Sequence, residues 1–231
     1  MSVKSFWGNA TWNVVHTIAY LSTLESTSTN IEVDVDLTLE EFYDFLSLLQ
    51  HTLPCDECKV NVVGEIEEAR LNPELNASQS PLRISHFIHN NVNRRLGKLE
   101  PPYEIIYISF EEREASGELL NELRKDIIIM LGCMALAHKN PSPESKKSFV
   151  KLFDILSSFG IYESQFSDFL EVNDVRYYLT SPERFFYFIF VFSTRVYLLF
   201  QGQRYNIFRS YFEKNLTSQL AENGDSCSFC G

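Results

Sequence analysis

The chain has 231 residues and a formal net charge of −11. This length allows one large domain or two small ones, and the acidic balance disfavours binding to nucleic acids or anionic membranes, which relies on clustered Lys and Arg. Only 9 Gly and 8 Pro occur, so we expect long helices rather than a β-protein with many tight turns, and 19 Phe with 11 Tyr predict an aromatic core.

We recognise no targeting signal and no membrane-spanning segment in the sequence. The first eight residues hold no apolar stretch of signal-peptide length. The most apolar run, 185–200, is interrupted by Arg195, and its uninterrupted part is too short to span a bilayer. We therefore expect no signal peptide, no membrane insertion and an intracellular location.

The first predicted helix runs from Ser5 to Leu24. Trp12, His16 and Tyr20 recur every four residues, so they share one face of this helix. Taken alone, this pattern predicts an ordinary amphipathic core helix. A loop rich in Ser, Thr and acidic residues follows over 25–36.

The second predicted helix leads directly into a pair of cysteines. It begins at Thr38, with Glu41 at the capping-box position. Cys55 and Cys58 then stand at the start of a third helix that ends near Leu71. Unsatisfied N–H groups and the helix dipole favour a thiolate at such a position.

The third predicted helix has a proline at its start and apolar residues along its length. Proline is tolerated in the first helical turn, and Pro54 suits that position. The residues expected to bury one side of the helix are Val60, Val62, Val63 and Ile66. We expect a polar turn region over 72–81 after it.

The fourth predicted helix begins at Ser80 or Pro81 and stops at Gly97. It carries a row of polar, weakly charged side chains spaced three and four apart: His86, His89, Asn90 and Asn93. A solvated surface usually carries Lys and Glu, so this row predicts a bound polar ligand or a buried hydrogen-bond network. No acid or Cys at metal-ligand spacing stands beside the two histidines.

The rest of the chain is predicted to be helical after one strand-like run or extended connector, Tyr103–Phe110. The expected helices cover 119–137, 145–159, 163–169, 181–200 and 203–220. Cys133 lies within an apolar helix and is predicted to be an inert core thiol. The last residues, 221–231, are small and polar and contain Cys227 and Cys230.

Three interpretations compete for the two CxxC pairs, Cys55/Cys58 and Cys227/Cys230. Four cysteines could hold zinc, although structural zinc sites usually draw on nearby turns and these pairs lie nearly a chain length apart. A thioredoxin-like site would need a CxxC after a strand in a βαβ pattern, and these flanks are helical. The third interpretation is a CxxC beside a redox cofactor, supplied with electrons by the terminal pair.

Three motifs occur together in one order and spacing. They are Trp12-(three residues)-His16-Thr17-Ile18-Ala19, Pro54-Cys55-Asp56-Glu57-Cys58 and His89-Asn90-Asn91-Val92-Asn93-Arg94-Arg95-Leu96-Gly97-Lys98. This combination resembles the Erv/ALR family of FAD-linked sulfhydryl oxidases over roughly the first half of the chain. The resemblance implies an all-α fold, with a four-helix bundle FAD domain over 1–110, an additional helical domain over 111–220 and a tail over 221–231.

The resemblance also implies roles for individual residues. Cys55 would be the interchange cysteine and Cys58 the flavin-proximal one, with Cys227 and Cys230 as the shuttle pair. Electrons would pass from protein dithiols through these cysteines to FAD and then to O2, giving hydrogen peroxide. The cofactor-binding residues would be Gly8, Trp12, His16, Tyr20, His89, Asn90, Asn93, Lys98 and Tyr103.

Departures from the family pattern indicate a subfamily. A Trp expected five residues before His89 is replaced by Ile84, and no cysteines remain for an extra structural disulfide. These traits resemble the sulfhydryl oxidases of large DNA viruses, so we expect a homodimer in the host cytoplasm or virion. The alternative is a non-enzymatic helical interaction or virion structural protein whose CxxC pairs are structural or bind zinc.

Overall fold

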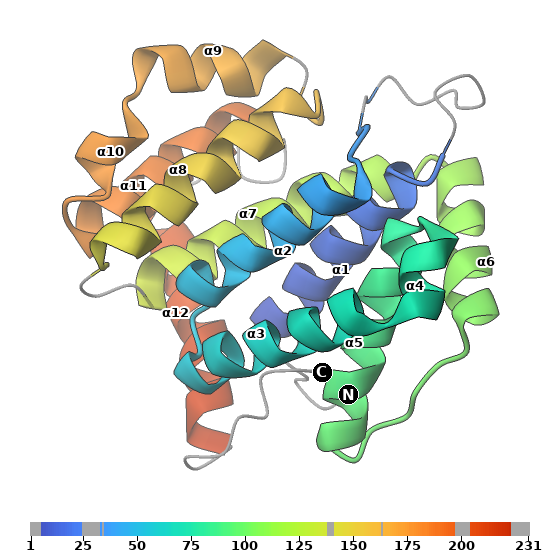
Figure 1. The fold of residues 1–231 in the computed structure, drawn as a ribbon. Coiled ribbons are helices and arrows are strands. Elements are labelled where there is room, and N and C mark those ends of the chain that lie inside the picture. Colours follow the sequence, from blue (N-terminus) through green and yellow to red (C-terminus); the bar gives the residue numbers. More distant parts are fainter. Residues whose placement is uncertain are drawn as a thin grey trace.

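The computed structural model describes residues 6–24, 33, 35–137, 141–162, 164–196 and 204–222, and every regular element in these ranges is a helix (Figure 1). The helices are α1 (Phe6–Leu21), α2 (Leu39–Thr52), α3 (Asp56–Leu71), α4 (Pro73–Ser78), α5 (Pro81–Arg95), α6 (Tyr103–Ala115), α7 (Leu119–Ala137), α8 (Pro143–Ser158), α9 (Ser164–Val172), α10 (Val175–Tyr178), α11 (Pro182–Val196) and α12 (Tyr205–Glu222). The predicted all-α fold is therefore confirmed.

Local hydrogen bonds start and stop the helices of the first half. The Thr38 hydroxyl accepts from the Glu41 amide (3.3 Å), and the Glu41 carboxylate accepts from the Thr38 amide (2.9 Å). This is the predicted capping box. After α5, Gly97 takes a positive φ of 64°, which is favourable for glycine and turns the chain out of the helix.

Helix α6 replaces the strand-like run predicted over Tyr103–Phe110. Its inward side chains follow helical spacing, because Tyr103, Ile106, Tyr107 and Phe110 pack against the core. Ile105 and Ile108 raise the strand propensity of the run and led to the wrong prediction. In the structure both are exposed, at 59% and 48%, so they do not decide how the segment packs. Tertiary packing of one helical face decides this segment.

Other local predictions also need correction. The region 72–81 contains α4, which the Asn72 side chain caps by accepting from the amides of Glu74 and Leu75. Val60 was expected to be buried and is 73% exposed. Pro54 precedes α3 rather than lying in its first turn, because Cys55 is the N-cap. Helix α10 was not predicted.

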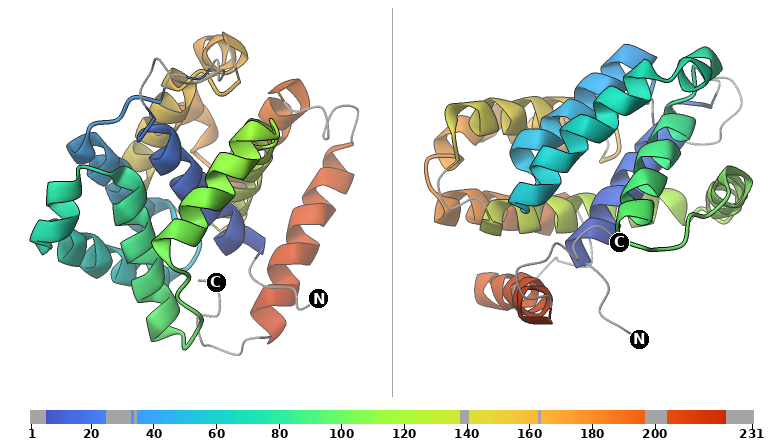
Figure 2. Two further views of the ribbon diagram at one scale, coloured as in Figure 1. Left: turned by 90° about the vertical axis from the view of Figure 1, so that its right-hand side faces the viewer. Right: turned by 60° about the horizontal axis from the view of Figure 1, so that its bottom comes forward.

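The second half packs on the first through α7 and α8. Helix α7 lies against α1 and α11, and α8 lies against α2; Figure 2 shows the layers from two sides. Phe149, Phe153, Phe166, Phe185 and Phe192 are fully buried in this half, as the aromatic composition predicts. The division into domains at 110/111 stays a prediction.

Cys133 and Gly132 lie where α7 meets its neighbours. Cys133 is fully buried, and burial raises the pKa of its thiol, as expected for an inert core cysteine. A Cβ at Gly132 would come within 2.3 Å of the Phe212 ring, so glycine permits the close approach of α12. No helix among the described residues is long and apolar enough to cross a membrane.

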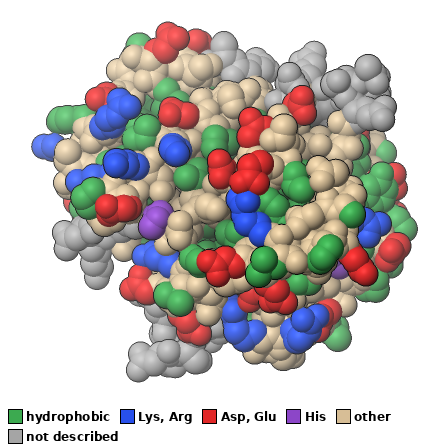
Figure 3. Space-filling view, in the orientation of Figure 1, with side chains coloured by type: hydrophobic (Ala, Val, Ile, Leu, Met, Phe, Trp, Pro, Cys, Tyr) green, Lys and Arg blue, Asp and Glu red, His purple; other side chains and the backbone are tan. Residues whose placement is uncertain are grey.

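The surface mixes charges of both signs. On the face shown in Figure 3, acidic and basic side chains are interspersed. Arg70 on α3, for example, donates from Nη1 to the Glu40 carboxylate of α2 at 2.8 Å. Exposed ion pairs of this kind contribute little stability, so the fold rests mainly on its apolar core.

Candidate functional site

The Cys55–Cys58 pair forms a disulfide at the N-terminus of α3, with 5.2 Å between the two Cα atoms. Cys55 is the N-cap residue and its sulfur accepts from the Cys58 amide at 3.2 Å. Cys58 is 4% exposed, whereas Cys55 is partly exposed. The two sulfurs are therefore unequal, because an incoming thiol can reach Cys55 more easily than Cys58.

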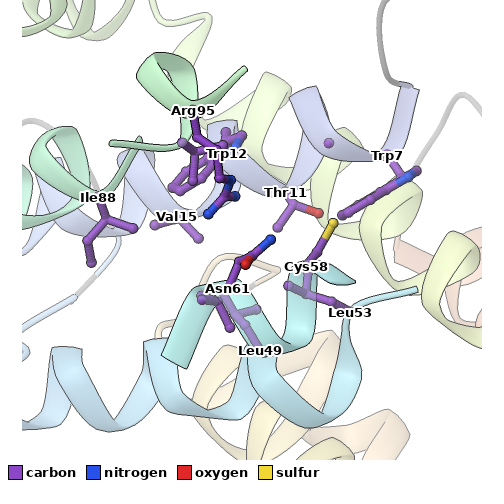
Figure 4. A pocket seen from close by; sticks show the side chains of 13 residues that line it. Trp7, Thr11, Trp12, Val15, Leu49, Leu53, Cys58, Asn61, Ile88 and Arg95 are labelled. Atoms are coloured by element: carbon purple, nitrogen blue, oxygen red, sulfur yellow. The ribbon is translucent and has the colours of Figure 1, made fainter. Parts of the chain in front are cut away.

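Cys58 faces a narrow, apolar cavity of about 480 Å³, its mouth included, which we call the disulfide cavity (Figure 4). Helices α1, α2, α3 and α5 all contribute to its wall. The large apolar side chains in this wall include Trp7, Trp12, Val15, Leu49, Ile88 and Val92. The lining therefore favours a mostly apolar group beside the disulfide.

Three polar side chains, Thr11, Asn61 and Arg95, interrupt this apolar wall, and Arg95 is paired with Glu65 at 2.9 Å. The Thr11 hydroxyl is buried and has no hydrogen-bond partner among the described residues. Leaving such a group unsatisfied costs roughly 1–3 kcal/mol. Asn61 lies one turn after Cys58 on α3 and also faces the cavity. Thr11 and Asn61 are therefore placed to bond a polar edge of a ligand.

A second, larger cavity of about 1740 Å³, its mouth included, lies on the other side of Trp12; we call it the wide cavity. Trp12 lines both cavities, so they meet at its ring. His16, His89 and Asn90 line the wide cavity together with residues of α6, α7 and α12. Three of the four members of the predicted polar row of α5, His86, His89 and Asn90, thus lie in this wall.

Stacked rings and hydrogen bonds join α1 to α5 at this wall. The rings of Trp12 and His89 are nearly parallel, at 3°, with centroids 4.2 Å apart. The Ser85 hydroxyl donates to the Leu82 carbonyl (3.0 Å), so it must accept from His16 Nδ1 at 2.9 Å. His16 Nε2 then accepts from His89 Nδ1 at 2.7 Å. This chain of bonds assigns the neutral Nδ1–H tautomer to His16 and places a proton on Nδ1 of His89.

Burial keeps these histidines uncharged. It lowers the pKa of His16 well below the ordinary value, and His89 and His86 add to this effect. Burial also lowers the pKa of His89, to about 4, with smaller contributions from His86 and Lys98. Near neutral pH the wall beside Trp12 is therefore polar but uncharged.

The lowered pKa values predict acid sensitivity of the protein. In the unfolded chain, His16 and His89 become protonated near pH 6.5. In the folded chain, His89 becomes protonated only near pH 4. Stability should therefore be complete above about pH 6.5 and fall as the solution is acidified, with His89 alone accounting for a loss of roughly 2.5 kcal/mol at pH 4.5 and His16 adding to it. Urea unfolding at several pH values measures this loss, and His89→Gln should reduce it. An unchanged pH dependence in that variant would contradict the prediction.

Comparison with models of protein families matches residues 9–113 to the Erv1 / Alr family. This segment of the chain, residues 9–113, belongs to the Erv1/Alr family. The resemblance found in the sequence is thus confirmed for the family, and the match supports an oxidoreductase of the flavoprotein type. No curated protein and no solved structure matches the chain.

The structure brings five of the predicted Erv1/Alr cofactor residues to the two cavities. Gly8 and Trp12 line the disulfide cavity, and Trp12, His16, His89 and Asn90 line the wide one. Asn90 also donates to the Pro101 carbonyl at 3.2 Å, which ties the connector before α6 to α5.

Four other predicted residues line neither of these cavities. Tyr20 donates to the Glu114 carboxylate and stacks on Phe110, so it holds α6 against α1. The Lys98 amide donates to the Asn93 carbonyl at 2.8 Å at the end of α5. Tyr103 lies beneath the guanidinium of Arg83. Their assignment to a cofactor stays a prediction, and Cys227 and Cys230 lie outside the described residues.

The sequence contained a signal for wall residues that we did not predict. Gly8, Thr11, Trp12 and Val15 have the spacing i, i+3, i+4, i+7 of one helical face, and all four line the disulfide cavity. Asn61 likewise lies three residues after Cys58. Among the described residues, no group of three or more His, Cys, Asp or Glu side chains could hold a metal ion.

Proposed function

We propose that the protein is a FAD-dependent thiol oxidase that forms disulfides in protein substrates and reduces O2 to hydrogen peroxide. The observation that supports this best is the buried Cys58 sulfur of the Cys55–Cys58 disulfide, which faces an apolar cavity walled by Erv1/Alr helices. A purely structural disulfide does not require an apolar cavity beside its buried sulfur.

The residues present fit FAD on two counts. The narrow apolar cavity suits a flat isoalloxazine ring, and the unsatisfied Thr11 hydroxyl offers it a hydrogen bond. The wide cavity begins on the other face of the wall, where Trp12 and His89 present flat rings for the adenine end. Gly8, His16 and Asn90 would complete these contacts, in line with the family resemblance.

The cysteines carry out two exchanges. A substrate thiolate attacks the more exposed Cys55 sulfur, the Cys55–Cys58 bond breaks, and Cys58 leaves as a thiolate that the N-terminus of α3 stabilises. The second substrate thiolate attacks the substrate sulfur of this mixed disulfide, which releases Cys55 and the oxidised substrate. The cycle closes when the Cys55 and Cys58 thiols re-form their disulfide and give up two electrons and two protons. FAD held in the two cavities would supply the acceptor for the electrons and the chemistry that delivers them, with the protons, to O2. Each cycle thus converts two thiols and O2 into one disulfide and H2O2.

The direct test joins a spectrum to an activity. The purified protein should show a flavin absorption band at about 450 nm, and it should consume oxygen when given a reduced dithiol. A colourless protein that holds zinc and consumes no oxygen would refute the oxidase and favour the structural alternative.

Thr11→Val provides a test of the disulfide cavity with opposite effects on stability and on binding. Because valine has nearly the same shape and removes an unsatisfied hydroxyl, the flavin-free protein should become more stable by about 1 kcal/mol. Flavin affinity should fall about fivefold, because the hydrogen bond to the ligand is lost. Thermal unfolding and flavin titration measure the two effects.

Thr17→Val is the matched control. Thr17 is also fully buried with an unsatisfied hydroxyl, but it lines neither cavity. This variant should gain stability and bind flavin like the parent. Equal flavin affinity in both variants would remove Thr11 from the site.

The terminal cysteine pair is proposed as the shuttle between substrate proteins and Cys55. Replacing both Cys227 and Cys230 by serine should preserve turnover of a small dithiol, which can reach Cys55 directly, and slow the oxidation of a reduced protein about tenfold. Oxygen uptake with the two substrates measures the difference. Equal losses with both would refute the shuttle role. The expected homodimer and the viral subfamily stay predictions.

A further inference from the structure

The wall of the wide cavity extends beyond the part of the chain that matches the family. The match ends at residue 113, yet Glu122, Lys125, Asp126 and Ile129 of α7 line the same space as His16 and His89. Helix α7 can reach this space because it packs along α1, the helix that carries Trp12 and His16 (Figures 1 and 2). The second half of the chain therefore helps to form the candidate cofactor site.

The charged side chains on this wall differ in whether they already form an ion pair. Arg113 donates from Nη1 to both Asn13 and Glu122 at 2.9 Å, so its charge is already paired. Lys125 is exposed at the rim and forms no ion pair with any described residue. Among the described Lys and Arg residues that line the wide cavity with Trp12 and His89, Lys125 is therefore the one without an ion pair.

Asp126 offers a carboxylate at the same place. Asn13 donates to its Oδ2 at 2.5 Å, which orients the carboxylate between α1 and α7. Its Oδ1 accepts no hydrogen bond from a described residue, and the side chain lines the wide cavity. A carboxylate so placed can accept hydrogen bonds from a pair of hydroxyl groups, as acidic residues do from the ribose of dinucleotides.

We propose that α7 completes the FAD site, with Lys125 binding the pyrophosphate and Asp126 accepting hydrogen bonds from the adenosine ribose. This inference rests on the proposed function. The inference follows from the order of groups along FAD, in which the pyrophosphate and the adenosine follow the flavin ring. With the flavin ring in the disulfide cavity, these groups would pass Trp12 and enter the wide cavity. There a lysine ammonium and a carboxylate match a phosphate and a diol.

The test compares FAD with riboflavin, which has the flavin ring but lacks the phosphates and adenosine. Lys125→Gln and Asp126→Asn should each weaken FAD binding to the full-length protein about tenfold and leave riboflavin affinity within about twofold. Asp126→Asn keeps an oxygen for Asn13, so the contact between α1 and α7 is preserved. Flavin fluorescence titration measures both affinities, and the rate of FAD release from the holoprotein is a second readout.

Two controls separate binding from folding. Lys151→Gln removes an exposed lysine of α8 that lies away from the wide cavity, and it should leave both affinities unchanged. Lys125→Arg keeps the charge and should restore most of the FAD affinity.

The outcomes distinguish this inference from the proposed function. Selective loss of FAD affinity, with riboflavin unaffected and the melting temperature of the flavin-free protein unchanged, supports the α7 site. Unchanged FAD affinity, or equal loss of both ligands, overturns it even if the parent protein is a flavin oxidase. A parent protein that binds neither flavin would refute the proposed function as well.

Discussion

Replacing Cys58 by serine should reduce dithiol-dependent oxygen consumption by at least about 10³-fold, while the protein still folds and binds flavin. The reason is geometric, because Cys58 is the buried cysteine of the pair and the one that lines the disulfide cavity. A hydroxyl at this position cannot form the Cys55–Cys58 disulfide, so no electron pair can pass from substrate to the cavity. Oxygen-electrode rates and the flavin spectrum of the variant measure the two properties.

The control for this prediction is Cys133→Ala. Cys133 is as deeply buried as Cys58 but lies on α7, and burial keeps its thiol protonated. This variant should retain turnover per folded molecule, even if it unfolds at a lower temperature. Substantial turnover in Cys58→Ser would remove Cys58 from its proposed role.

Trp12→Ala should weaken FAD binding about 100-fold, the largest effect expected for a residue that is not a cysteine. Trp12 lines both cavities and stacks on His89, so its removal opens the two spaces into one and takes away a flat surface for the cofactor. Loss of a packed Trp against a ligand is worth about 3 kcal/mol, which corresponds to this factor. Titration of the flavin-free variant with FAD gives the affinity.

Two further substitutions make this prediction specific. Trp12→Phe keeps a smaller flat ring and should lie between the parent and the alanine variant. Tyr187→Ala removes an aromatic residue of α11 that is 48% exposed, and it should not change FAD affinity. If Trp12→Ala binds FAD as tightly as the parent, the cofactor does not pass Trp12 and the assignment of the two cavities fails.

Features that depend on neighbouring residues could be predicted from the sequence. The Thr38–Glu41 capping box, the helix stop at Gly97 and the placement of Cys55 and Cys58 at a helix start each depend on contacts within a few residues. A helix end requires only that nearby groups satisfy its free amides and carbonyls, so local sequence is sufficient. The resemblance carried by the three motifs also predicted a four-helix bundle around the CxxC.

Features that depend on distant residues could not be predicted in this way. The α5 row of His and Asn looked uniform in sequence, but the fold divides it, since His89 stacks on Trp12 of α1 whereas His86 bonds the Pro101 carbonyl. Helix α6 formed despite strand-like residues because its Phe110 face packs on α1. In both cases the partner lies far away in the chain, and propensity is too weak to oppose its packing.

The sequence by itself determined the family resemblance of the first half, the helical class and the position of the Cys55–Cys58 pair at a helix start, because each is specified by residue types at short, regular spacing. Only the tertiary structure decided which sulfur is buried, which hydroxyl lacks a partner and which helices enclose the cavities. Cys58 faces the disulfide cavity because four helices meet there, and Lys125 reaches the wide cavity because α7 packs along α1. Burial of this kind is a property of the assembled helices, since each wall is made of residues that are distant in the chain.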